Sequence, residues 1–272
     1  MLARRPCPKA IDTFRRARAH FLCFLIPSAH FSTPGALDDL TFLPFRLSHG
    51  RLADTADEAL PSRLSAWRED VLELSDDGTH FGYVHEGEGR LETAGGSYTL
   101  RQGMYFASPT PCRIGGQGQG VVITRLGYYG VFTLGGPVER WGRLRYIDGC
   151  TDSLLIPPQM SGDPCLNALY FPAGISQTEH THPSARVGLV ARGTGLCRTP
   201  DATFPLTPGL TFIIRAEGKH SFQTEGEEMV VVAYHPDSDY GPTHEAHPMI
   251  NRTVVRGVPA SQIESIHTPP EG

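Results

Sequence analysis

Short runs of β-branched and aromatic residues, separated by turns rich in glycine and proline, make up most of the chain after residue 70. Val121-Val-Ile-Thr124 and Met229-Val-Val-Val-Ala-Tyr234 have the length and composition of buried strands. Tyr98–Leu100 and Thr203–Leu206 lead directly into glycine turns. Apolar residues do not recur with the 3.6-residue spacing of an amphipathic helix anywhere in residues 70–250. The pattern therefore predicts an all-β protein.

The strand pattern repeats at a constant offset of 106 residues. Gly82-Tyr-Val-His-Glu-Gly-Glu-Gly89 and Gly188-Leu-Val-Ala-Arg-Gly-Thr-Gly195 both read G-x-V-x-x-G-x-G. The same offset aligns Gly103 with Gly209 without a gap. Because several glycines stay in register, the sequence predicts two related β units of about 100 residues each. Closing a sheet into a barrel removes its edges and leaves a mouth that can hold one small ligand.

Three histidines distinguish the second unit from the first. His180 and His182 follow a turn at Gly174, and alternation along a strand projects both side chains to one face. His220 ends the later segment Ile214–His220, so three imidazoles converge if the two segments lie side by side. Neutral imidazole suits Zn, Cu, Fe and Ni, and three protein ligands with open positions are typical of catalytic metal sites. We therefore predict one mononuclear metal site.

Two further comparisons sharpen this prediction. The repeat offset places Leu74, Asp76 and Ile114 where the second unit has its three histidines, which predicts a first unit without metal and with a structural or interfacial role. Glu179 neighbours the histidine pair, but alternation directs it to the opposite face, where a role outside the ligand set is favoured.

The second unit resembles the cupin superfamily. Its first motif, G-x5-H-x-H-x3,4-E-x6-G, is matched by Gly174, His180, His182 and Gly193. Its second motif, G-x5-P-x-G-x2-H-x3-N, is matched by Gly209 and His220. With the first unit included, the chain resembles a bicupin. The resemblance implies two jelly-roll barrels in tandem. We therefore expect four parts of the chain: a poorly structured extension (1–40), a degenerate, metal-free barrel (41–150), a metal-binding barrel (151–250) and a C-terminal tail (251–272).

The chain departs from these motifs at positions that affect chemistry. Arg186 occupies the place of the usual glutamate ligand, and arginine cannot ligate a cation. Arg215, Glu217 and Thr224 replace the proline, glycine and asparagine of the second motif. The site thus resembles the three-histidine cupins, which include thiol and diketone dioxygenases. This likeness implies one divalent transition metal, with Fe(II) favoured and Zn, Ni or Mn as alternatives.

Arg186 has two alternative roles at this stage. It shares strand parity with His182, so it could hold a substrate carboxylate in a bidentate fork beside the metal. Alternatively, it turns outward into a surface ion pair. Tyr170 and Phe212 also lie near the predicted ligands in sequence, where a role as core aromatics is favoured over a role in lining the pocket.

The resemblance favours a metal-dependent enzyme that acts on a small polar or acidic molecule. One reaction type that it suggests is that of a dioxygenase, which is an oxidoreductase. Isomerase, lyase and hydrolase activities, or non-catalytic ligand binding, stay open as alternatives. No helix-turn-helix signal follows the second unit. A homodimer is an expectation from the family.

Composition narrows the partners and the compartment. The net charge of −5 and the lack of a clustered Lys/Arg face do not indicate nucleic-acid binding. Six cysteines without a CxxC pair favour reduced thiols over disulfides, and hence the cytoplasm. No segment approaches the roughly 20 apolar residues of a membrane span.

Two segments at the ends of the chain leave alternatives open. Residues 1–37 hold six Lys/Arg and one acid, which indicates either an organelle-targeting segment or an extension that begins at an upstream start codon. The segment His235–Arg252 holds three histidines and three acids. Its prolines favour a loop, acting as a lid or a dimer contact, over a second metal site.

Overall fold

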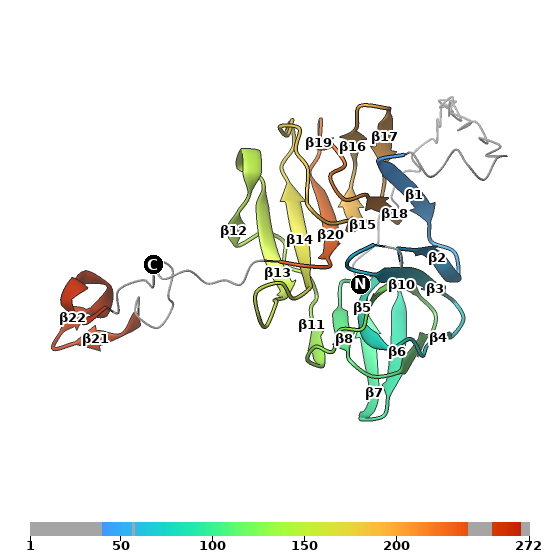
Figure 1. The fold of residues 1–272 in the computed structure, drawn as a ribbon, viewed down its shortest axis with the longest axis horizontal. Helices are drawn as coiled ribbons and strands as arrows, with labels where there is room; N and C mark the ends of the chain where they lie inside the picture. The colour runs from blue at the N-terminus through green and yellow to red at the C-terminus, as the bar shows by residue number, and fades with distance from the viewer. Residues whose placement is uncertain (1–39, 56–57, 239–251, 268–272) are drawn as a thin grey trace, which may run out of the picture. The chain divides into compact units, whose positions relative to one another are not determined.

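The computed structural model describes residues 40–55, 58–238 and 252–267, all within the compact unit Asp39–Gly272. Strands dominate this unit (Figure 1). The predicted all-β class is therefore confirmed. The extension expected at residues 1–40 lies almost entirely outside the described residues, as does most of the segment following His235.

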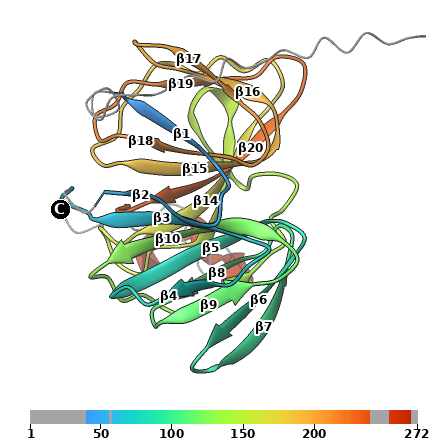
Figure 2. The same cartoon turned by 90° about the vertical axis from the view of Figure 1, so that its right-hand side faces the viewer.

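The first half of the chain contributes two antiparallel sheets (Figure 2). The larger sheet has six strands, in the order β11 (Thr133–Gly135), β8 (Tyr105–Ser108), β5 (Gly78–Glu86), β10 (Gln119–Leu126), β3 (Ser62–Arg68) and β2 (Gly50–Asp54). The smaller sheet has four, in the order β4 (Leu72–Leu74), β9 (Cys112–Gly115), β6 (Glu88–Thr93) and β7 (Gly96–Arg101).

The second half repeats this arrangement. Its larger sheet has seven strands, in the order β1 (Phe42–Arg46), β18 (Leu210–Ile214), β15 (Arg186–Gly193), β20 (Met229–His235), β14 (Cys165–Phe171), β13 (Thr151–Ile156) and β12 (Leu144–Arg145). Its smaller sheet has three, in the order β17 (Thr203–Leu206), β16 (Gly195–Arg198) and β19 (Ser221–Gln223).

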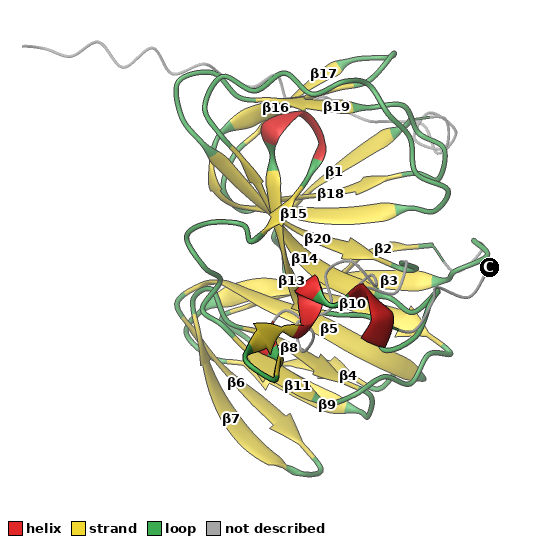
Figure 3. Cartoon of the chain, turned by 90° about the vertical axis from the view of Figure 1, so that its left-hand side faces the viewer, coloured by secondary structure: helices red, strands yellow, loops and turns green. Residues whose placement is uncertain are grey.

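Helical structure is confined to short turns in the described part of the chain (Figure 3). These include the 3-10 turns η1 (Ile147–Gly149), η3 (Ala260–Gln262) and η4 (Glu264–Ile266). A separate two-stranded ladder pairs β21 (Val254–Val255) with β22 (Val258–Pro259). None of the described helices is long and apolar enough to cross a membrane.

The sequence placed residues 41–150 in the first barrel, but strand β1, at the start of this range, belongs to the second half. It joins the sheet of the second half, with Phe42 opposite Ile214 on β18. Phe42 is fully buried there and stacks against Phe204 and Phe212, at centroid distances of 4.6 and 4.9 Å. The chain therefore enters the second half before it builds the first, because these aromatic contacts place β1 along the free edge of β18.

Three apolar clusters fill the described fold. One lies within the first half and centres on Trp67, Leu91 and Ile114. A second lies within the second half and includes Phe171, Phe212 and Phe222. The third combines side chains of the six-stranded and seven-stranded sheets, such as Phe81 and Leu189. The two halves thus share one buried interface in addition to their own interiors.

The repeat seen in the sequence has a structural counterpart at two glycines. Gly82 lies opposite Phe106, and Gly188 lies opposite Phe212. An added Cβ would lie 2.1 Å from the Phe106 ring at Gly82 and 2.2 Å from the Phe212 ring at Gly188. In both halves, glycine is therefore required because the aromatic ring of the neighbouring strand covers its α-carbon.

Four of the six cysteines are described, and all four are buried free thiols: Cys112, Cys150, Cys165 and Cys197. The preference for reduced thiols over disulfides is confirmed for these residues. Burial raises the pKa of the Cys112 and Cys165 thiols to about 11, so neither is a ready nucleophile.

Candidate metal centre

The segment before β15 is held against the segment between β18 and β19. His180 and His220 form an isolated antiparallel bridge: His180 N donates to His220 O at 2.9 Å, and His220 N donates to His180 O at 3.0 Å. Glu217 N donates to His182 O at 2.7 Å. The backbone therefore aligns the two segments that the sequence analysis expected to lie side by side.

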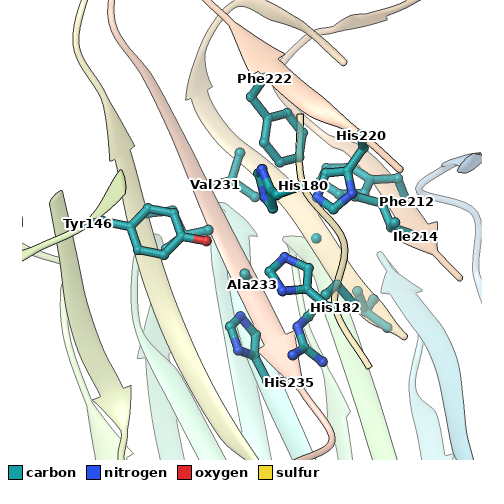
Figure 4. A pocket seen from close by; sticks show the side chains of 14 residues that line it. Tyr146, His180, His182, Phe212, Ile214, His220, Phe222, Val231, Ala233 and His235 are labelled. Carbon is teal, nitrogen blue, oxygen red and sulfur yellow. The ribbon is translucent and has the colours of Figure 1, made fainter. Parts of the chain in front are cut away.

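The three predicted histidines converge on one point (Figure 4). Their ring centroids are 4.4 Å apart for His180 and His220, 5.1 Å for His180 and His182, and 5.3 Å for His182 and His220. One ligand nitrogen from each ring lies within 4.8 Å of the other two. Among the described residues, this is the one group of three or more His, Cys, Asp or Glu side chains close enough to hold a metal ion.

Hydrogen bonds orient two of the imidazoles. The Nδ1 of His180 lies 2.9 Å from the carbonyl oxygen of Thr178, and the Nδ1 of His220 lies 2.9 Å from that of Gly218. A carbonyl oxygen only accepts, so each Nδ1 carries the proton and each Nε2 keeps its lone pair for a ligand. Such a bond from the outer ring nitrogen is typical of metal-binding histidines.

Burial keeps two of the three histidines, His182 and His220, uncharged. It lowers the pKa of His182 to about 3, with a further contribution from the positive charge of Arg186. It also lowers the pKa of His220 to about 4. Neutral imidazole is the form that binds a metal ion. The proton positions and the donor set therefore both fit a divalent transition metal.

The histidines lie at one side of a pocket within the second half (Figure 4). Most of its other lining is apolar: Leu169, Val187, Gly188, Phe212, Ile214, Phe222, Val231 and Ala233. Phe212, for which a core role was favoured, lines this pocket as well as packing in the interior. Tyr170 packs in the cluster shared by the two halves, and its hydroxyl donates to Glu139 O at 2.9 Å.

Arg186 combines features of its two expected roles. It lines the pocket, and only 13 % of its side chain is exposed. Its Nη1 nevertheless lies 3.4 Å from Asp237 Oδ1 and donates to Ser184. Its buried Nε has no hydrogen-bond partner among the described residues. The guanidinium is therefore held at the pocket by an ion pair.

Two pocket residues were not identified from the sequence. His235 ends β20, and its ring centroid lies 6.4 Å from that of His182. Strand alternation with Val231 and Ala233 could have placed it on this wall. Tyr146 directs its hydroxyl towards the pocket (Figure 4). Burial raises its pKa, so the phenol keeps its proton. No sequence signal marks Tyr146, because it precedes an irregular turn.

The position equivalent to His220 in the first half is Cys112, and the expectation of Ile114 was wrong. Leu74 pairs with Cys112 as His180 pairs with His220, and Ile114 occupies the place of Phe222. The segment Ile214–His220 is two residues longer than Ser108–Cys112, so the constant offset fails across this turn.

The other expected differences can also be located. Asp76, aligned with His182, forms an ion pair with Arg63. Glu179 is exposed, 4.0 Å from Lys219 Nζ, and is not part of the histidine group. The first half therefore has a leucine, a cysteine and an ion-paired aspartate where the second half has imidazoles.

Comparisons with known proteins agree with this fold. Residues 172–236 match the family model of the AraC-like ligand binding domain. No curated protein sequence matches the chain. Among solved structures, the chain is similar to salicylate 1,2-dioxygenase from Pseudoaminobacter salicylatoxidans with gentisate, at 12 % identity and a TM-score of 0.51, over 71 % of this chain and 80 % of that chain.

Two further structures are similar. A protein from Pseudomonas aeruginosa described as glyoxylate-induced is 13 % identical, with a TM-score of 0.53, over 75 % of this chain and 83 % of that chain. A cupin 2 conserved barrel domain protein from Leptotrichia buccalis is 13 % identical, with a TM-score of 0.49, over 71 % of this chain and 88 % of that chain. The matched family model and the two structures with TM-scores above 0.5 show a cupin-type, jelly-roll fold, in agreement with the resemblance stated from the histidine motifs.

Proposed function

We propose that His180, His182 and His220 hold one divalent transition metal and that the adjoining pocket binds a small acidic molecule. The observation that carries this proposal is the convergence of three imidazoles, two of them oriented by backbone carbonyls, at the wall of a largely apolar pocket. We favour Fe(II), with Zn, Ni and Mn as alternatives, because the site resembles that of three-histidine cupins; imidazole ligands by themselves suit Zn, Fe and Ni alike.

The residues of the pocket would divide the work on a bound substrate. Arg186 would bind the acidic group, because guanidinium matches the geometry of a carboxylate. The apolar walls would exclude water and strengthen this electrostatic interaction. Bound ferrous iron would supply redox chemistry towards dioxygen, while the protein orients the substrate. This division favours an oxidoreductase of the dioxygenase type.

A second candidate is a ligand-binding domain without catalytic activity. The match of residues 172–236 to a ligand-binding family model favours it, because the match spans the whole histidine site. The two candidates share the metal and the pocket. They differ in whether the bound molecule is converted.

We also propose that the two pairs of sheets are two barrels in tandem and that only the second binds a ligand. The buried pair of Leu74 and Cys112, at the position of His180 and His220, supports a metal-free first barrel. This reading gives the first half a structural role through the apolar cluster that the two halves share.

Purification of the full chain without oxygen, followed by elemental analysis, tests the metal. Oxygen-electrode measurements with small acids then separate the two candidates. Stoichiometric iron with substrate-dependent oxygen uptake is expected for the dioxygenase. Stoichiometric zinc or nickel without uptake would exclude the dioxygenase and favour a hydrolase, an isomerase or a binding protein. Absence of any bound metal after reconstitution would overturn the proposed site.

A further inference from the structure

A buried pair of polar residues lies next to the floor of the pocket. Asn167 on β14 lies directly opposite Ala233, and Ala233 lies opposite Gly188. Both small residues line the pocket, so Asn167 occupies the next position in the same row across the sheet. Asn167 Nδ2 donates to Asp152 Oδ2 at 2.6 Å. The pair therefore lies directly behind two lining residues, Ala233 and Leu169, although neither Asp152 nor Asn167 lines the pocket itself.

Each member of the pair keeps one acceptor unused. Asp152 is 9 % exposed and Asn167 is 5 % exposed. Asp152 Oδ1 and Asn167 Oδ1 are buried and have no hydrogen-bond partner among the described residues. A buried acceptor without a partner is unfavourable, so such atoms call for a water molecule or a bound group that donates to them.

The opposite requirement is found at Arg186. Its buried Nε is a donor without a partner among the described residues. The charges of both groups act on the pocket residue Tyr146: burial raises the pKa of its phenol, Asp152 adds to this effect and Arg186 opposes it. The region around the pocket thus combines an unpaired donor with two unpaired acceptors.

We propose that Asp152 and Asn167 form a subsite that accepts hydrogen bonds from a hydroxyl or protonated amine on the same small acid that Arg186 binds. This inference rests on the function proposed above for the pocket. It defines the substrate class more narrowly, as a small acid carrying a separate hydrogen-bond donor. The buried acceptors would also discriminate, because a ligand without the donor leaves them unpaired.

Three acids of equal chain length test the subsite: propionate, 3-hydroxypropionate and β-alanine. Their binding to the zinc-loaded full chain can be measured by ligand-observed NMR, since zinc is diamagnetic. We expect both acids that carry a donor to bind about tenfold more tightly than propionate, in line with the gain of one buried hydrogen bond. The negative charge of Asp152 should favour the ammonium group of β-alanine.

Two substitutions separate the subsite from the rest of the pocket. Asn167→Leu removes an acceptor at similar volume and should abolish the preference for the donor. Asp152→Asn preserves shape and should weaken β-alanine binding while 3-hydroxypropionate binding persists. Thr211→Val is the matched control, because Thr211 is also buried with an unpaired hydroxyl but lies opposite Leu189, on the other face of the sheet from Gly188, Ala233 and Asn167. It should leave all three affinities unchanged.

The outcomes distinguish the subsite from the proposed function. Equal binding of the three acids to the wild-type chain would overturn the subsite alone and would assign its unpaired atoms to buried water. Failure of all three acids to bind the zinc-loaded chain would overturn the acid-binding pocket together with the subsite. If Asn167→Leu does not fold, Asp152→Asn decides: unchanged β-alanine affinity in that variant would also overturn the subsite.

Discussion

The two halves of the molecule use the same strand arrangement and differ at one end of it. In the second half, His180 and His220 face each other across a backbone bridge beside a pocket. In the first half, Leu74 and Cys112 occupy the same pair of positions and pack into the apolar interior. A turn longer by two residues accompanies the change. The capacity to hold a metal ion therefore depends on a few side chains and one turn, while the strands of the two halves are similar.

The largest expected effect is loss of metal from the second half. Replacing His180, His182 or His220 by alanine should each weaken metal binding by more than about 100-fold, because three ligands are the minimum set for this site. Elemental analysis after reconstitution measures the effect. Thr181→Ala is the control, since Thr181 lies between two of the histidines with its side chain exposed. Full retention of metal by any histidine variant would remove that residue from the site.

The equivalent test in the first half should change stability and leave metal binding intact. Ile114→Ala should lower the free energy of unfolding by about 2–5 kcal/mol, because Ile114 is fully buried and the change leaves a cavity. Denaturant unfolding measures the loss. Val71→Ala, at a side chain that is 48 % exposed, should lower it by less than about 0.5 kcal/mol. A loss of metal in folded Ile114→Ala would contradict a purely structural first half.

His80 in the first half occupies the position that Arg186 has in the second half. Both lie two residues before the repeated glycine, which is Gly82 on β5 and Gly188 on β15. His80 is fully buried, and its Nδ1 lies 2.8 Å from Thr124 Oγ1. Burial lowers the pKa of His80 to about 4, although the nearby Asp76 opposes this shift.

The sign of the resulting pH dependence follows from proton uptake. Unfolded His80 binds a proton below about pH 6.5, whereas the folded side chain resists protonation down to about pH 4. Stability from this residue is therefore complete above pH 6.5 and declines as the pH falls, by about 2 kcal/mol between pH 7 and 4.5. Unfolding measured across this range should show a shallower decline for His80→Gln than for the wild type. The control is His49→Gln, at an exposed residue, for which the free energy of unfolding should fall with pH as in the wild type. The same decline in the wild type and both variants would show that His80 does not cause it.

The sequence predicted those features that depend on local spacing. Alternation placed His180 and His182 together, and the glycine repeat matches two equivalent glycine–aromatic pairs in the structure. Features that depend on distant contacts could not be predicted in this way. Strand β1 joins β18 because Phe42 packs on Phe204 and Phe212, and no local pattern specifies that pairing. The alignment of His220 with Ile114 was wrong because a constant offset cannot register an insertion within a turn.

The smallest expected effect distinguishes ligand binding from metal binding within the second half. Arg186→Leu should weaken the binding of a small acid such as 3-hydroxypropionate by about tenfold, because a partly buried guanidinium is lost from the pocket. Metal content should stay unchanged, since arginine does not ligate the ion. Binding measured by NMR and metal measured by elemental analysis give the two readouts.

Arg186→Lys separates charge from the contacts made by the guanidinium. Lysine keeps a positive charge opposite Asp237 but lacks the planar fork, so acid affinity should fall between those of the wild type and Arg186→Leu. Loss of metal in parallel with loss of acid binding in both variants would instead show that Arg186 supports the histidines. Recognition of the acid would then have to come from other residues of the pocket.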